Sequence, residues 1–159
     1  MITEIKVPGA ISTQVTGIND FGVMTGIYED RVGNHGFIGT VGAFTKFDVP
    51  GSAPGRTAPQ SINNKGQVVG FYQIAIPGSP YSLEYDAGVV TSYDVPGSPG
   101  TVLTAINDAD TVGGTYSSNV RDQGFTATTT GAVTKVFAPS KTAVALLEGV
   151  SNNGQAVGG

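Results

Sequence analysis

A block of the form Ile-Asn-Asp/Asn-x-Gly-x-Val-x-Gly returns along this chain at a fixed interval. Its copies span residues 18–26, 62–70, 106–114 and 150–158, so each begins 44 residues after the last. The fourth copy begins Val-Ser-Asn-Asn in place of Ile-Asn and keeps the spacing. A fixed period of roughly 20–50 residues is typical of repeat architectures. The chain is therefore expected to fold as an array of similar units.

Each unit is expected to contain four short strands. In the second unit, the segments 43–49, 57–63, 67–72 and 81–85 are rich in Val, Ile, Thr, Phe and Tyr, and Gly, Pro and Asn separate them. Short strands with turn signals between them indicate an all-β protein. Four strands in such a unit are typical of a β-propeller blade. The prediction is an all-β fold of β-propeller-type repeats, with about 3.5 to 4 four-stranded blades of about 44 residues.

The repeat landmarks predict one domain, residues 1–159. They place an N-terminal strand at 2–7, full units at approximately 10–50, 55–96 and 100–139, and a partial unit at 143–159. The unit boundaries carry Val-Pro-Gly at 7–9, 49–51 and 95–97. Because Pro cannot donate to a strand ladder, we expect 45–49 and 91–95 to be outermost strands and 57–63 to be innermost.

The incomplete last unit leaves three hypotheses open. The chain is a fragment of a larger propeller, or a small ring that closes imperfectly, or one copy of an assembly in which a second chain supplies the missing strands. Open repeat ends leave unpaired backbone groups that template such pairing, so we favour assembly into an oligomer or a fibre.

The polar residues of the block are predicted to be structural. Asn, Asp and Gly tolerate the positive φ of tight turns, and Asn side chains bond nearby backbone. The final Gly of each block falls inside a strand, where Gly marks close approach of another backbone. These predicted structural residues are Asn19, Asp20, Asn63, Asn64, Asn107, Asp108, Asn152, Gly26, Gly70, Gly114 and Gly158. Packing between blades is expected from Ile18, Ile62, Ile106, Val68, Val69, Phe37, Phe47 and Phe125.

Composition argues against several functional classes. The chain has 8 Lys and Arg against 12 Asp and Glu and no basic cluster, so we expect no nucleic-acid partner. No apolar run approaches the roughly 20 residues that span a bilayer, so we expect no membrane insertion. With 0 Cys, disulfides and thiolate metal sites are excluded.

No residue pattern points to catalysis, a metal or a cofactor. His35 is the single His and is expected to be a repeat residue near a blade turn. Asp108 and Asp110 resemble part of a calcium loop, yet the other copies carry Gly at the position of Asp110 and no Glu follows at loop spacing. We therefore predict a protein that is not an enzyme.

Three tyrosines recur at one position of the repeat, namely Tyr28, Tyr72 and Tyr116. They are a candidate ligand face, because aligned aromatic rings suit sugars or partner loops. The alternative, which we favour, is that each ring fills space between blades.

The blocks at 62–70 and His35-Gly36-Phe37 resemble the bacterial HAF repeats, a family of probable extracellular repeats. Nearly the whole chain is covered by the resemblance, although 123–125 reads Gln-Gly-Phe and 81–83 reads Tyr-Ser-Leu. It implies a secreted or surface-exposed, β-propeller-like protein and no assigned activity. The function expected from sequence is thus an extracellular structural or adhesive protein that acts through self-assembly or partner binding. A carbohydrate-binding module, and a fragment of a propeller lyase or hydrolase, are the alternatives.

Overall fold

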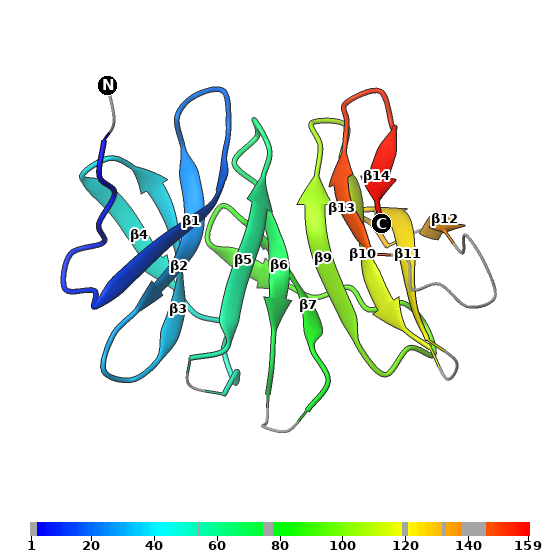
Figure 1. Ribbon diagram of the computed structural model, residues 1–159, viewed down its shortest axis with the longest axis horizontal. Helices are drawn as coiled ribbons and strands as arrows, with labels where there is room; N and C mark the ends of the chain where they lie inside the picture. The colour runs from blue at the N-terminus through cyan, green and yellow to red at the C-terminus, as the bar shows by residue number, and fades with distance from the viewer. Residues whose placement is uncertain (1–2, 54, 75–77, 119–120, 132, 138–145) are drawn as a thin grey trace.

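Four antiparallel sheets follow one another along the chain (Figure 1). The computed structural model describes residues 3–53, 55–74, 78–118, 121–131, 133–137 and 146–159. Sheet 1 contains β1 (Ser12–Ile18), β2 (Met24–Glu29), β3 (Asn34–Thr40) and β4 (Ala43–Phe47). Sheet 2 contains β5 (Thr57–Ile62), β6 (Val68–Tyr72), β7 (Tyr81–Asp86) and β8 (Val89–Thr91). Sheet 3 contains β9 (Thr101–Ile106), β10 (Thr111–Ser117), β11 (Asp122–Thr128) and β12 (Val133–Phe137), and sheet 4 contains β13 (Leu147–Val150) and β14 (Ala156–Gly158).

The sheets stand side by side, and their first strands face one another. The first strand of each sheet contacts the first strand of the next: β1 contacts β5, β5 contacts β9, and β9 contacts β13. Within each four-stranded sheet, the strands pair in chain order. Sheets 1 and 4 lie at opposite ends of the row, and the described residues form no closed ring (Figure 1). The prediction of an all-β chain built from several antiparallel sheets is confirmed at this level.

A β-bulge recurs in the first strand of every sheet. The register shifts between Val15 and Gly17 in β1, and at the corresponding places in β5, β9 and β13. The extra residues fall at 16, 60, 104 and 148, again 44 apart. A bulge increases the local twist and bends the strand. The first strand of each sheet is therefore expected to bend at the same position of the repeat.

The recurring glycine of the second strand lies opposite this bulge. A Cβ on Gly70 would stand 2.2 Å from the carbonyl oxygen of Ala58. The same atom would stand 2.1 Å from a carbonyl oxygen at Gly26 and at Gly114, and 1.9 Å away at Gly158. These positions therefore hold Gly because a neighbouring backbone occupies the space of a side chain.

The Val-Pro-Gly segments link consecutive units. In each, the residue after Gly donates its N–H to the Val carbonyl at 3.0 Å, and the Gly has φ near +80°, as in a type II turn. The Val N–H is bonded to a Thr hydroxyl of the next strand at 3.1 Å, as in Val49 to Thr57. Val7 and Val49 are buried, so these linkers also contribute side chains to the hydrophobic core.

The predicted N-terminal strand is wrong for the residues that can be seen. Residues 3–7 have no strand pairing, and residues 1 and 2 lie outside the described residues. A strand there needs a paired neighbour, and sheet 1 already has its four strands. In the partial unit, the strand begins at Leu147, and residues 143–145 lie outside the described part of the chain.

The outermost strands lie earlier than predicted. They span Ala43–Phe47 and Val89–Thr91 rather than 45–49 and 91–95. In sheet 2 the hydroxyl of Ser82 receives the N–H of Tyr93 at 2.7 Å and donates to the Tyr93 carbonyl. The Ser82 side chain thus takes the place of the backbone hydrogen bonds that would continue β8 beyond Thr91.

Candidate assembly interface

The turn between the first two strands of each sheet is built around one asparagine. The Oδ1 of Asn63 accepts the backbone N–H of Lys65 at 3.1 Å and that of Gln67 at 3.0 Å. Asn19 and Asn107 accept the equivalent pairs of N–H groups in their own turns. This Asx-type bonding explains why Asn recurs here, because its short side chain reaches the backbone two and four residues on.

The other side of the same asparagine joins one sheet to the next. Nδ2 of Asn19 donates to the carbonyl of Asn63 at 3.0 Å, and Nδ2 of Asn63 donates to the carbonyl of Asn107 at 3.1 Å. Asn107 in turn donates to Ser151 at 2.8 Å. Each bond spans 44 residues, so the sequence period and the structural ladder coincide. The four turns share one rim of the array (Figure 1).

A second ladder runs through the next residue of the block. The backbone N–H of Asp20 donates to Oδ1 of Asn64, that of Asn64 to Asp108, and that of Asp108 to Asn152, at 2.7–2.9 Å. The backbone N–H of Asn64, ahead of the Asn152 and Asn64 side chains, holds the pKa of Asp108 below its ordinary value. Both oxygens of this carboxylate serve the ladder.

Asp110 has a conformational role in its turn. Its φ is +60°, whereas Gly22, Gly66 and Gly154 stand at the same repeat position with φ between +74° and +82°. Asp is one of the few side chains that tolerate this region. Its carboxylate pairs with Lys65 at 2.6 Å.

Apolar contacts between sheets also follow the repeat. A Cβ on Gly36 of sheet 1 would meet Pro59 of sheet 2 at 3.0 Å, and one on Gly113 of sheet 3 would meet Leu147 of sheet 4 at 2.3 Å. Residues 59, 103 and 147 are buried, with Leu103 at 0% and Leu147 at 4% exposure. The first strand of each sheet therefore presses its side chains against the preceding sheet.

On the outer face of sheet 1, the equivalent side chains are exposed. Ile18 is 64% exposed, whereas Ile62 and Ile106 at the equivalent positions are each 7% exposed. Val15, which corresponds to Leu103, is 38% exposed. The prediction that Ile18 packs between blades is wrong, because no sheet precedes sheet 1 among the described residues.

Sheet 4 is open on the opposite side. Val157 is 65% exposed, whereas Val69 at the equivalent position is 1% exposed. The ladders end here as well: among the described residues, the backbone N–H of Asn152 has no acceptor, and the Ser151 hydroxyl bonds within its own turn. At the sheet 1 end, the Asn19 carbonyl accepts the N–H of Gly22 of its own turn and, within the described part of the chain, no bond from another sheet. One outer face thus offers acceptors and the other a donor.

The three repeated tyrosines lie in different sheets, and each packs on its cross-strand neighbour. Tyr28 is 5% exposed and stacks on His35 with ring centroids 5.1 Å apart. Tyr72 stacks on Tyr81 at 5.6 Å. Tyr116 donates its hydroxyl to Gln123 at 3.0 Å. Each ring therefore has a partner within its own sheet.

His35 is held between two carboxylates. Nδ1 lies 2.8 Å from Asp48, Nε2 lies 3.1 Å from Asp30, and the side chain is 12% exposed. Burial lowers the pKa of His35, but the hydrogen bonds and charges of Asp48 and Asp30 outweigh it and raise the pKa above its ordinary value. This arrangement favours the doubly protonated imidazolium, which fastens the β2–β3 loop to the segment after β4.

The sequence did not predict the exposed apolar faces of sheets 1 and 4. The signal was present in the block, since Ile18, Ile62 and Ile106 share one position, but sequence alone does not give the side on which each side chain emerges.

No protein-family model matches the chain, and no curated protein matches it. Among the described residues, no helix is long and apolar enough to cross a membrane.

Proposed function

We propose that this protein is a structural repeat module whose sheets are blades of a β-propeller-type array, and that it joins other copies of itself head to tail. The face of sheet 1 around Val15 and Ile18 would dock on the face of sheet 4 around Val157. The role is non-enzymatic and adhesive. An extracellular location and kinship with the HAF repeats belong to this proposal and rest on sequence.

One observation carries the proposal: positions that are buried between sheets inside the array are exposed at its ends. Ile18 and Ile62 differ from 64% to 7% exposure, although they hold the same place in the repeat. Repeat arrays with uncapped ends bury their apolar faces against further units. A like unit fits here, because the outer faces carry the two halves of a contact that already occurs between successive sheets.

The polarity of the ladders sets the direction of assembly. The backbone N–H donors of the second ladder point from each sheet toward the next, so a new copy would offer its Asp20 carboxylate to the backbone N–H of Asn152. Such a head-to-tail contact is heterologous and gives either a closed ring or a filament. The glycan alternative has less support, because Tyr28 is buried and the three candidate tyrosines each contact a cross-strand residue of their own sheet.

The test uses one substitution on each face and a matched control. Ile18→Asp and Val157→Asp each place a charge on one outer face. Val41→Asp changes an equally exposed residue, at 61%, in the β3–β4 turn. Sedimentation velocity over a wide concentration range should show assembly for the wild type and Val41→Asp, and monomers for each face variant.

Mixing the two face variants sharpens the result. Each retains one intact face, so the mixture should stop at a species of twice the 16.1 kDa chain mass. A wild-type chain that stays monomeric at high concentration, or equal loss of assembly in Val41→Asp, would refute the proposal.

A further inference from the structure

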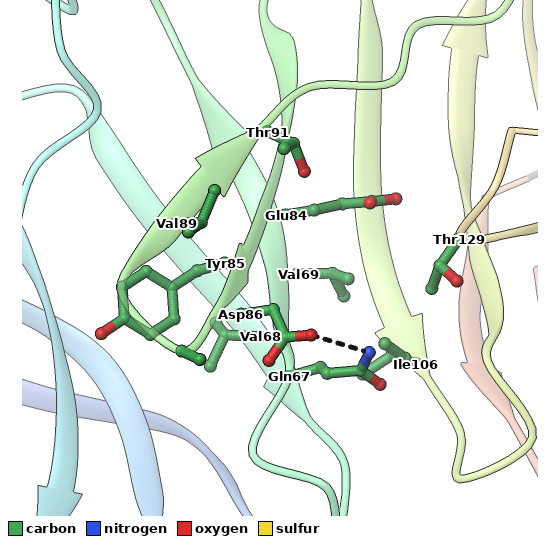
Figure 2. A pocket seen from close by; sticks show the side chains of 11 residues that line it. Gln67, Val68, Val69, Glu84, Tyr85, Asp86, Val89, Thr91, Ile106 and Thr129 are labelled. Atoms are coloured by element: carbon green, nitrogen blue, oxygen red, sulfur yellow. Dashed lines mark hydrogen bonds between the residues drawn. The ribbon is translucent and has the colours of Figure 1, made fainter.

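A cleft separates sheets 2 and 3 on the side away from sheet 1 (Figure 2). It has a volume of about 390 Å³. Val69 and Ile106 form an apolar wall, and Gln67, Asp86, Thr91 and Thr129 supply polar groups. The side chain of Glu84 extends from β7 across the cleft toward Thr129, whereas Tyr85 points to the opposite side of its sheet (Figure 2).

Glu84 is a half-buried acid with one unpaired oxygen. Its Oε1 is buried and makes no hydrogen bond, and the hydroxyl of Tyr93 is in the same state. Burial raises the pKa of Glu84 to about 7. The pKa of Tyr93 is raised as well, by burial first and then by the charge of Glu84. Buried polar atoms normally have partners, so the unpaired Oε1 of Glu84 at the cleft calls for one.

The repeat shows that the fold does not need these groups. The position of Glu84, opposite Val69, is Ile38 in sheet 1 and Thr126 in sheet 3. The position of Tyr93 is Phe47 in sheet 1 and Phe137 in sheet 3. The carboxyl of Glu84 and the hydroxyl of Tyr93 are thus both departures from the repeat, and Glu84 lines the cleft.

We propose that this cleft binds a small organic ammonium ion, with its charged group against Glu84 and its apolar part on Val69 and Ile106. Two acidic groups, Glu84 and Asp86, line the cleft, and among the described residues that line it there is no Lys, Arg or His. A buried carboxylate is stable when a cation pairs with it. An ammonium ion supplies that charge, and its N–H groups can donate to the Glu84 carboxylate.

Binding of a cation should depend on pH, because the bound carboxyl must be ionised. With the pKa near 7, about one-tenth of Glu84 is ionised at pH 6 and about nine-tenths at pH 8. An alkylammonium ion stays charged over this range, so its affinity should rise about tenfold from pH 6 to pH 8. The nearby charged groups are Asp86 on the same strand, and Asp110 and Lys65, which pair with each other at the edge. The Asp110 carbonyl accepts the N–H of Thr129.

The experiment is a titration followed by backbone amide shifts in NMR, with n-butylammonium chloride as the probe and 1-butanol as its neutral counterpart. In the wild type, n-butylammonium should shift the amides of Thr129 and Ile106 and bind about tenfold more tightly at pH 8 than at pH 6. Glu84→Gln should lose this pH dependence and most of the affinity. Asp86→Asn should keep the pH dependence, since Glu84 remains.

Glu84→Ile repeats the comparison with the residue that sheet 1 already uses at this position, which protects against a folding defect in Glu84→Gln. Equal binding of 1-butanol and n-butylammonium would overturn the proposal, as would unchanged binding in both Glu84 variants. An absence of shifts at tens of millimolar probe, or saturable binding of methyl β-glucoside in place of the amine, would overturn it as well.

Discussion

At the scale of single residues, steric space and bonding decide what each repeat position can hold. The glycines at 26, 70, 114 and 158 face a carbonyl oxygen from the bulged strand. Glycines in the turns, such as Gly66, have open space around the missing Cβ and are needed for their positive φ. Two different physical demands therefore act on glycines of one sequence block.

Gly70→Ala should destabilise the protein by about 3 kcal/mol, because the new Cβ must displace the backbone of Ala58 or β6 itself. Gly66→Ala should cost only about 1 kcal/mol, because it strains φ in open space. Urea unfolding of both variants measures the difference. Equal losses would show that sterics at the bulge do not decide the choice of Gly70. A bulkier Gly70→Val should lower the melting temperature further.

At the scale of an element, the asparagine turn combines two functions in one side chain. Asn63 is 4% exposed, and it closes its own turn while it bonds the next sheet. Sheet 4 shows that the functions separate: the hydroxyl of Ser151 accepts the N–H of Gln155 at 3.0 Å and so keeps part of the turn bonding without an amide for the next sheet.

Substitutions of Asn63 can measure the contributions of these two functions to stability separately. Asn63→Ser should keep a turn bond and lose the bond to the Asn107 carbonyl, at a cost of about 1–2 kcal/mol. Asn63→Ala loses both and leaves the partly buried N–H groups of Lys65 and Gln67 without this acceptor, so it should cost about 2–4 kcal/mol. Equilibrium unfolding checks the order. Identical values for Ser and Ala would mean that the turn bond contributes nothing.

The strands and turns also show which parts of the fold could be predicted from the sequence. Strand number and order in each full unit, and the turn residues, follow from the period and from the chemistry of Asn and Gly. The bulge could not be predicted, because an extra residue such as Thr16 has no distinctive type. The early end of β8 depends on the Ser82 hydroxyl, where sheet 1 carries Gly36. The Glu84 cleft requires the pairing register, which the period alone does not fix.

At the scale of the whole molecule, the array behaves as a stack in which each sheet contacts its neighbours. Stability in such a stack is the sum of unit terms and of interfaces between neighbours. A new neighbour on the sheet 1 face would therefore add one interface, with Ile18 and Val15 removed from water.

A tandem protein, in which two copies are joined by a flexible Gly/Ser linker, tests this view. Its melting temperature should exceed that of the single chain by about 5 °C, because a further interface forms within one molecule. The control carries Ile18→Asp in the second copy only and should melt like the single chain. A tandem protein that melts at the same temperature with and without this substitution would show that its copies do not stack.

The hydrogen-bond ladders that join the turns of successive sheets constrain how the length of such a chain can vary. The five-residue turn at 63–67 cannot gain residues without breaking bonds to both neighbouring sheets. The loops between the second and third strands lie away from these rungs and already differ, since 30–33 is short and 73–80 is longer. Insertions are thus tolerated on one side of the protein, whereas duplication or loss of whole 44-residue segments keeps every rung in register. The gene can lengthen in steps of one unit while its loops diversify.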